Sequence, residues 1–563
     1  MKSLILIAVS LTASALVPAG HAAVNAYPSS TTVFPSGPLP PGGKRALTLH
    51  AAVGEREGGL IVVTGAKRVA LSVDGRGLGP LLLRVSFGHF VRFGSRLVPD
   101  ALLPWDGSER TAEQPNQPLY VQAEVPYGTK PGTYRATLEV KGGLRPVVVR
   151  VSVRVHPVVL PRPGEVAGSL LTSFHSSPET YVDRVRTLYG ETSRAELTAA
   201  NDNLYRFLAA YRLSPASWGF GEPRTASGYV TSPKWWLDSL ANMIREIAAG
   251  PFSTLRIPIS SNRTAPGNYI GGIDPFEPET WCPYLRTVHA SWLEHGWLGS
   301  GIPYLFAYDE PGVKGQRLVA QQASVAHRCF PSARVMMTGN PSPSGDNRYL
   351  WDGPAEDDVD IWAVLTRRYY GSYASGRKDR SRRNLRAINT LRKRGKLVWA
   401  YTYAGPGSPG FLATEPLADP RLFVLWTALE GVGGIHYGEG TTSYKGAASP
   451  LDALPSGGEF ALLYPGRSAP IPSARLEQIR DGIEDWEVLQ LVRRTSGAAT
   501  VRQILGDAGL FSAGRAGVHL ACTTGCELTG SQPFAWPRWS RGTSTPARIE
   551  RARLKALRLA SRP

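Results

Sequence analysis

The chain has 563 residues, a formal charge of +18 and a sequence pI near 9.8. Since a domain usually holds about 100 to 200 residues, two or three domains are expected. The charge is spread, apart from concentrations at Arg377 to Lys396 and Arg548 to Arg562, which we expect to be solvated helical faces. No nucleic-acid motif accompanies it, so nucleic acid is not expected as a partner, although electrostatic attraction to anionic polymers is compatible with the charge.

The first residues are typical of a signal peptide. Lys2 gives the positive start, Leu4 to Leu16 the apolar stretch, and Gly20-His21-Ala22 a cleavage site. Residues 1–22 are therefore predicted to be removed, and the protein to be secreted, either extracellular or associated with the cell envelope. The apolar stretch is too short for a hydrocarbon core of about 30 Å, so we expect no membrane insertion.

Four cysteines in an oxidising compartment favour disulfides. Cys522 and Cys526 enclose a short turn and are predicted to pair, and Cys282 with Cys329 is the second expected pair. No further Cys stands at ligand spacing beside Cys522 and Cys526, so zinc is not expected there. We expect neither a metal nor a cofactor.

The N-terminal third is rich in short β-type runs. Residues 23–44 contain many Pro, Ser and Gly residues and are predicted to be a flexible leader. Residues 45–157 are predicted to form a β-sandwich domain, because six apolar runs alternate there with turn residues. The runs are Leu60 to Val63, Val69 to Val73, Leu81 to Val85, Leu119 to Val125, Tyr134 to Val140 and Pro146 to Val155.

Beyond the Pro-rich linker Pro157 to Gly164, strands alternate with helical patterns such as Trp235 to Ala249 and Gln316 to Arg328. This alternation predicts a (β/α)₈ TIM barrel over residues 158–498, whose last helix starts at an N-cap, Ser473, and runs to Arg494. Residues 499–563 are predicted to be a C-terminal extension with a short disulfide loop and a basic tail. The eight expected strands are Ser169 to His175, Leu213 to Phe220, Phe252 to Ile259, Tyr304 to Tyr308, Arg334 to Thr338, Asp360 to Leu365, Leu397 to Tyr403 and Gly433 to Tyr437.

In such barrels the active site lies at the C-terminal ends of the strands. Asp309-Glu310-Pro311 ends one apolar strand and offers two carboxylates, the groups that glycosidic bond cleavage usually requires. Neighbours on a regular strand face opposite sides, so both can face a substrate only if the strand breaks there. Pro311 favours the break and should hold Glu310 in an extended conformation. The alternative is that the tripeptide merely starts a loop and caps a helix.

The other strand-end residues are candidates for substrate binding. Sugar rings have apolar faces and hydroxyl rims, which suit aromatic side chains with a polar group, although ordinary barrel packing also explains each aromatic by itself. The candidates are His175, Trp218, Arg256, Asn340, Trp362, Tyr369, Trp399, Tyr401, Tyr403, His436, Tyr437 and Glu439.

The segment Ser473 to Glu487 carries charges at helical spacings of three to five residues. Several of them could face the barrel rim. Physical reasoning alone favours an exposed helix with surface ion pairs, each of which stabilises a helix by only a few tenths of a kcal/mol.

Four stretches resemble glycoside hydrolase family 123 and the related proteins grouped as domain of unknown function 4091. They are His295 to Pro311, Val359 to Trp362, Val398 to Thr402, and Leu463 to Gly466 followed by Ser473 to Trp486. Gly54 to Glu57 and Val125 to Tyr134 resemble that family's leading domain, so the resemblance covers residues from about 45 to 495. One departure is Tyr437, where we expect the family's Trp.

The resemblance implies a retaining glycosidase that acts on a 2-acetamido sugar, such as an N-acetyl-β-galactosaminide. In that mechanism the substrate's own acetamido oxygen attacks the anomeric carbon. By position, Asp309 would stabilise this group, and Glu310 would be the general acid and then the base.

Two alternatives stay open. A conventional retaining glycosidase would use Glu310 as acid and Glu439 as nucleophile on a sugar without an acetamido group. A noncatalytic carbohydrate-binding protein would keep the barrel and the aromatic residues, but intact Asp309 and Glu310 argue against it.

Overall fold

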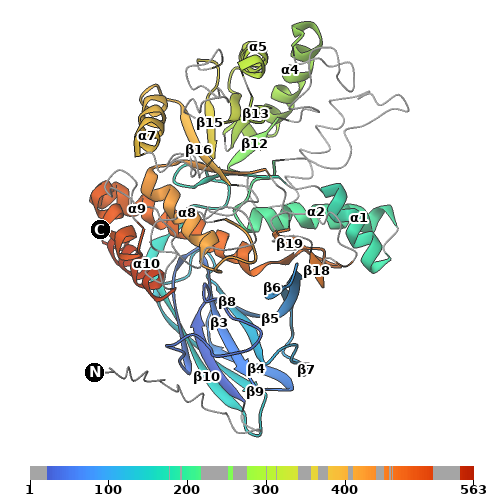
Figure 1. Ribbon diagram of the computed structural model, residues 1–563, viewed down its shortest axis with the longest axis vertical. Coiled ribbons are helices and arrows are strands. Elements are labelled where there is room, and N and C mark those ends of the chain that lie inside the picture. The colour runs from blue at the N-terminus through green and yellow to red at the C-terminus, as the bar shows by residue number, and fades with distance from the viewer. Residues whose placement is uncertain are drawn as a thin grey trace, which may run out of the picture.

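The structure is a computed structural model of the whole chain (Figure 1). It describes residues 22–175, 178–190, 193–216, 252–257, 276–299, 301–311, 313–339, 357–365, 378–402, 410–438, 451–454, 461–510 and 546–562, together with residues 355, 449 and 458. The predicted signal peptide and the pair Cys522 and Cys526 lie outside these residues. No described helix is long and apolar enough to cross a lipid bilayer.

Two sheets make up the N-terminal part of the chain, in the lower half of Figure 1. Side chains of both sheets form one hydrophobic cluster. Inward and outward residues alternate along strands such as β9 and β10, as the side chains of a strand with one buried face do. The first sheet contains β1 (Ala23–Pro28), β3 (Arg56–Thr64), β8 (Asn116–Glu124), β5 (Leu82–Phe93), β6 (Arg96–Pro104) and a late strand, β18 (Ala453–Leu454). The second contains β2 (Ala46–Val53), β10 (Val147–Val159), β9 (Gly132–Lys141), β4 (Arg68–Gly77) and β7 (Arg110–Thr111).

The predicted flexible leader is partly a strand. β1 pairs antiparallel with β3 from Ala23 opposite Thr64 to Pro28 opposite Gly59. Val24 and Ala26 are buried against the sheet cluster. The composition of residues 23–44 suggested a linker, but these alternating apolar residues gain more from burial than the chain loses in freedom.

Seven parallel strands form a nearly closed barrel above the sheets (Figure 1). Their order is β11 (Leu171–Phe174), β17 (Gly434–Tyr437), β16 (Leu397–Thr402), β15 (Ile361–Leu365), β14 (Arg334–Gly339), β13 (Ile302–Tyr308) and β12 (Thr254–Arg256). Each is one of the expected strands. The other expected strand, Leu213 to Phe220, is described only to residue 216 and contributes a single bridge from Pro215 to Phe174. The eightfold prediction is therefore reproduced only in part.

Helices follow most of these strands and cover the barrel. The described helices are α1 (Pro178–Tyr189), α2 (Arg194–Ala210), α4 (Pro278–Glu294), the 3₁₀ turn η1 (Trp297–Gly299), α5 (Val313–Cys329), α7 (Lys378–Lys393), α8 (Asp419–Glu430), α9 (Ala474–Asp507) and α10 (Pro546–Ala560). The predicted helix Gln316 to Arg328 lies within α5, whereas Trp235 to Ala249 lies outside the described residues. A short hairpin of β19 (Leu463–Tyr464) and β20 (Ile471–Pro472) precedes α9.

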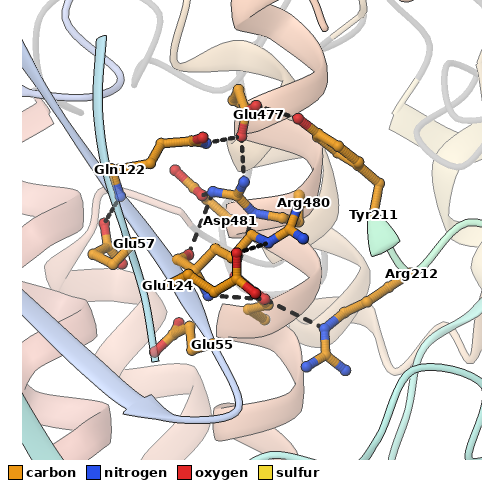
Figure 2. Close-up of polar contacts among 12 residues, drawn as sticks. Glu55, Glu57, Gln122, Glu124, Tyr211, Arg212, Glu477, Arg480 and Asp481 are labelled. Carbon is orange, nitrogen blue, oxygen red and sulfur yellow. Dashed lines mark hydrogen bonds and ion pairs between the residues drawn. The ribbon is translucent and has the colours of Figure 1, made fainter. Parts of the chain in front are cut away.

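Helix α9 starts as predicted, because the Ser473 side chain accepts a hydrogen bond from the backbone N–H of Leu476. The expectation that its charges are exposed is wrong. Arg480 is fully buried and pairs with Glu477, Asp481 and Glu484 of its own helix (Figure 2). The helix lies between the barrel helix α8 and the six-stranded sheet, so its charged face meets protein instead of water.

Residues from distant segments complete this buried charge network. Arg212, which follows α2, contacts Glu484 at 3.4 Å and Glu487 at 3.0 Å. Arg553 of α10 contacts Glu55 at 2.6 Å and Glu57 at 2.8 Å, both on the N-terminal part. The basic C-terminal segment is thus not a wholly solvated face, since Arg553 is only 4 % exposed.

The loop after β17 is attached to the N-terminal sheet. β18 pairs in parallel with Arg92 and Phe93 of β5. Beside it, His89 places Nδ1 2.8 Å from a Glu113 carboxylate oxygen and Nε2 2.8 Å from the Leu451 carbonyl oxygen. A carbonyl only accepts, so the ring satisfies a carboxylate and this carbonyl together only as the doubly protonated cation. Burial lowers the pKa of His89, but the interactions with Glu113 outweigh it and the pKa lies above its usual value.

The predicted disulfide between Cys282 of α4 and Cys329 of α5 is present, with Cα atoms 5.2 Å apart. It closes a loop with a sequence separation of 47 residues across strand β13. Replacing both cysteines by Ala should lower the free energy of unfolding by about 2 to 4 kcal/mol, because the unfolded chain gains freedom. Urea unfolding of the variant and the parent measures the loss. Equal midpoints and slopes for the two proteins would contradict it.

The charge network should impose a pH dependence on stability. Burial raises the pKa of Glu487 to about 8, against the lowering effect of Arg212. A carboxyl in the unfolded chain has a pKa near 4.3, so the folded state holds an extra proton between about pH 4.3 and pH 8. Stability from this group is therefore present at low pH and decreases as the pH rises through that window, by up to about 1.4 kcal/mol per pH unit.

Glu487→Gln removes the titrating proton and keeps the shape of the side chain. Its stability relative to the parent should increase from pH 5 to pH 8 and then level off in chemical denaturation. Glu294→Gln, at an exposed end of α4, is the matched control and should show a constant difference. Parallel stability curves for Glu487→Gln and the parent would refute the assignment.

Candidate active site

The end of strand β13 carries an irregularity that turns its last residues. Phe306 lies opposite Met336, but Tyr308 lies opposite Met337, so β13 contains one more residue than β14 over this stretch. An extra residue of this kind is a β-bulge, which bends a strand and redirects its side chains. The expected break in the strand is thus present, beginning just before Asp309.

Glu310 continues the distortion. Its φ is +49°, in the left-handed region, so the predicted extended conformation is wrong. For a residue other than glycine this conformation raises the free energy by about 1 to 3 kcal/mol, so it persists only where its surroundings hold it. The backbone N–H of Glu310 donates to Thr338 Oγ1 at 2.7 Å, and that hydroxyl donates to Asp309 Oδ1 at 2.8 Å. One buried hydroxyl on β14 thus fixes both adjacent acidic residues.

Tyr401 adds a second contact from across the barrel. Its hydroxyl donates to Glu310 Oε1, and the side chain is 7 % exposed at the end of β16. Asp309, Glu310, Thr338 and Tyr401 therefore meet at the C-terminal ends of β13, β14 and β16. Strand β15, which separates β14 from β16 in the sheet, contributes the inward Ala363 and Leu365 beside them.

A polar chain crosses the barrel interior below these groups. The Tyr304 hydroxyl is 2.7 Å from Ser173 Oγ, which is 2.9 Å from His436 Nδ1. Burial, with a further contribution from the positive charge of Arg256, lowers the pKa of His436 to about 3. The same two causes lower the pKa of His175 to about 4. Both imidazoles are therefore neutral at neutral pH, and Arg256 is the charged residue near them.

Arg256 and Trp399 also face the interior. The Arg256 guanidinium lies 5.1 Å from the centre of the Phe306 ring and donates to the Ala216 carbonyl. Trp399 is fully buried, with its ring edge-on to Tyr304 at 5.7 Å. A Cβ at Gly434 would lie 2.5 Å from Trp399 Nε1, so only glycine on β17 leaves room for the indole. Trp399 thus fills the barrel in the manner of a core residue.

The structure does not bring the other described candidates to this side. Trp362 and Tyr437 alternate with the inward residues of their strands and pack in the cluster between the barrel and its helices. Tyr437 contacts the Phe411 ring at 4.9 Å. Five further candidates lie outside the described residues: Trp218, Asn340, Tyr369, Tyr403 and Glu439.

Sequence reasoning missed Thr338, Ser173 and Tyr304. All three occupy inward positions on predicted strands, with the same parity as Met336, Leu171 and Phe306, so strand alternation could have identified them. Within the described ranges, no group of three or more His, Cys, Asp or Glu residues could hold a metal ion.

The site thus has two carboxylates at the strand ends of a parallel barrel, and hydroxyl groups hold them. Glycoside hydrolases use a pair of carboxyl groups of this kind. The comparison with protein families agrees. Residues 269–492 match the catalytic domain of glycoside hydrolase 123, so this part of the chain is similar to that domain. The match contains Asp309, Glu310, Thr338 and Tyr401. Curated protein sequences give no match to the chain.

Among solved structures, the chain is similar to a family 123 glycoside hydrolase from Clostridium perfringens that was studied for glycolipid glycan hydrolysis. The TM-score is 0.67 at 12% identity, over 96% of this chain and 99% of that one, so the two share a fold. A GH10 xylanase with a bacterial Ig-like domain, from termite gut, is 9% identical over 79% of this chain and 100% of its own, with a TM-score of 0.29. That score is too low to support an argument.

The contacts of Thr338 predict a positioning role. Thr338→Val keeps the volume but removes the acceptor for the Glu310 N–H and the donor to Asp309, at a cost of about 1 to 3 kcal/mol for the unsatisfied groups. Turnover of a nitrophenyl glycoside should fall by about 10 to 100-fold in kcat with little change in KM. Thr338→Ser keeps the hydroxyl and should restore most of kcat. Equal losses in the Val and Ser variants would show that the methyl group, rather than the hydroxyl, matters.

Proposed function

We propose that this protein is a secreted retaining glycosidase that cleaves a 2-acetamido sugar, such as an N-acetyl-β-galactosaminide, with help from the substrate. The observation that carries the proposal is the pair Asp309 and Glu310, redirected by the β13 bulge and tied together through Thr338. Adjacent carboxylates suit this mechanism because they act on neighbouring atoms of one ring, and the protein supplies no nucleophile. It is a known exception to the use of two separated carboxylates.

The proposed reaction has two steps. Glu310 as an acid protonates the glycosidic oxygen while the acetamido oxygen attacks the anomeric carbon, and the leaving group departs as an alcohol. The resulting oxazolinium carries positive charge, which the Asp309 carboxylate stabilises through the amide N–H. Glu310 then removes a proton from water while the water oxygen attacks the anomeric carbon. The bond between that carbon and the acetamido oxygen breaks, which restores the acetamido group and leaves the sugar with its original configuration.

The remaining groups have supporting roles in this scheme. Tyr401, by donating to Glu310 Oε1, directs the other carboxyl oxygen of Glu310 toward the leaving group. The neutral His175 and His436, with Arg256, are proposed to line the part of the barrel that receives the sugar. The glycolipid glycan hydrolysis of the Clostridium perfringens enzyme, with which this chain shares a fold, supports a glycan as the substrate class.

The proposal extends to the whole chain. Residues 1–22 would direct export, residues 45–157 would form a β-sandwich domain, and residues 213–216 would belong to the strand that completes an eightfold barrel. The shared cluster of the two N-terminal sheets supports the second of these, and the hydrogen bond from the Ala216 N–H to the Phe174 carbonyl supports the third.

The decisive test compares three variants on a panel of nitrophenyl glycosides that includes 2-acetamido sugars. Glu310→Gln should lower turnover by about 10² to 10⁴-fold on substrates with poor leaving groups. Asp309→Asn should lose much of the rate because an amide cannot offset the oxazolinium charge. Glu439→Gln should change little, and a thiazoline analogue of the cyclised intermediate should inhibit strongly.

The conventional alternative gives the reverse pattern. Glu439→Gln would abolish turnover, a fluorinated sugar would trap a covalent glycosyl-enzyme, and the thiazoline would have no special affinity. A covalent adduct on any carboxylate would therefore end the substrate-assisted proposal. Near-normal activity of Glu310→Gln on a natural glycan would end the assignment of the acid.

A further inference from the structure

A pocket of about 610 Å³ lies between the six-stranded sheet, the end of α2 and the residues just before α9. Its volume falls within the range of about 300 to 1,000 Å³ that is typical of small-molecule sites. None of its lining residues belongs to the ends of the barrel strands, so the pocket is separate from Asp309 and Glu310. The proposed reaction leaves it without a role.

The sheet side of the pocket carries a row of charged side chains. Arg56 Nε lies 3.5 Å and Arg84 Nη2 3.7 Å from the same oxygen, Glu124 Oε2. The sheet sets this row, because Arg56 of β3 is opposite Glu124 of β8, and Arg84 of β5 is opposite the neighbouring Gln122. The three side chains are 28%, 66% and 31% exposed, so both donors and acceptors are open to a ligand.

Aromatic rings stand at two other sides of the pocket. Trp105 donates its indole N–H to the Ser108 carbonyl at 2.9 Å, which fixes the orientation of the ring. Phe207 stacks on Tyr211 with ring centres 4.3 Å apart, so this second platform is also held in place. Both Trp105 and Phe207 are only partly buried. Rigid, partly exposed rings provide apolar contact area at little entropic cost.

This combination selects among ligand classes. An anion would meet the carboxylates of Glu124 and Asp106, and an apolar ligand would strand the charges of Arg56 and Arg84 away from water. A sugar ring has an apolar face for an aromatic platform and hydroxyls that both donate and accept. The geometry points to a second carbohydrate-binding site in this pocket, which holds a neutral sugar unit between Trp105, Phe207 and the Arg56–Glu124–Arg84 row.

The test detects ligand binding in the pocket through the fluorine NMR signal of Trp105. The Glu310→Gln protein is labelled with 5-fluorotryptophan, and the signal that disappears in Trp105→Phe identifies Trp105 among the 14 tryptophans. Lactose, cellobiose and N,N′-diacetylchitobiose are titrated separately, with octanoate and inorganic sulfate as the apolar and anionic probes. At least one disaccharide should shift the Trp105 signal saturably at millimolar concentration.

Two variants locate the binding. Ser86→Trp fills the pocket and should abolish the shift, and the milder Arg84→Ala should weaken it by about tenfold, as expected for a central charged contact. Arg154→Ala, at an exposed position of β10 outside the pocket, should leave it unchanged. If no disaccharide shifts the signal, or if octanoate or sulfate shifts it instead, the proposal is wrong. The readout does not depend on turnover, so a failure of the proposed glycosidase mechanism would leave this result intact.

Discussion

The fold depends on one constraint, which is that the charged face of α9 is buried. Four guanidinium groups, of Arg212, Arg421 on α8, Arg480 and Arg553, meet carboxylates from α9, α10 and the N-terminal strands. Figure 2 shows Arg212 and Arg480 in this network. Taking such groups out of water costs several kcal/mol each, and only multiple close partners offset that cost. Asp485 shows the balance: burial raises its pKa, but Arg421 and Arg553 outweigh the effect and hold the pKa below its usual value. The network therefore fixes how the sheets, the barrel and α10 are placed on a single helix, α9.

The site above it is positioned by the barrel in a different way. Its acidic pair owes its geometry to backbone irregularity, namely the bulge in β13 and the left-handed Glu310. Strain of this kind persists only where the surroundings hold it, and here Thr338 on the flanking strand β14 accepts from the Glu310 N–H and donates to Asp309. The buried charge network on α9 and the acidic pair at the end of β13 thus belong to different elements of the chain.

The sequence predicted the strands well because parallel barrel strands are nearly continuous apolar runs, which Ile361 to Leu365 and Leu397 to Thr402 both show. It also placed Asp309, Glu310 and Tyr401 at strand ends, and it predicted the Cys282–Cys329 disulfide. It misjudged α9 and Arg553, because helical spacing of charges is the same for an exposed face and for a face buried against distant partners. Glu55 and Arg553 are 498 residues apart, and no local pattern reports such a contact. The left-handed Glu310 was missed for a related reason: Thr338, which holds it, lies on the next strand.

The contact between Arg553 and the N-terminal strands also concerns how the chain acquires its structure. Glu55 and Glu57 are almost wholly buried, and the cation that they share is 498 residues away from Glu55 in the sequence. Until α10 docks, these acidic groups have no Arg553 beside them, and burying them alone is unfavourable. The N-terminal strands can pair with one another through contacts that are closer in sequence, but closing this long loop carries an additional entropic cost. Docking of α10 is therefore expected to be a late step in folding.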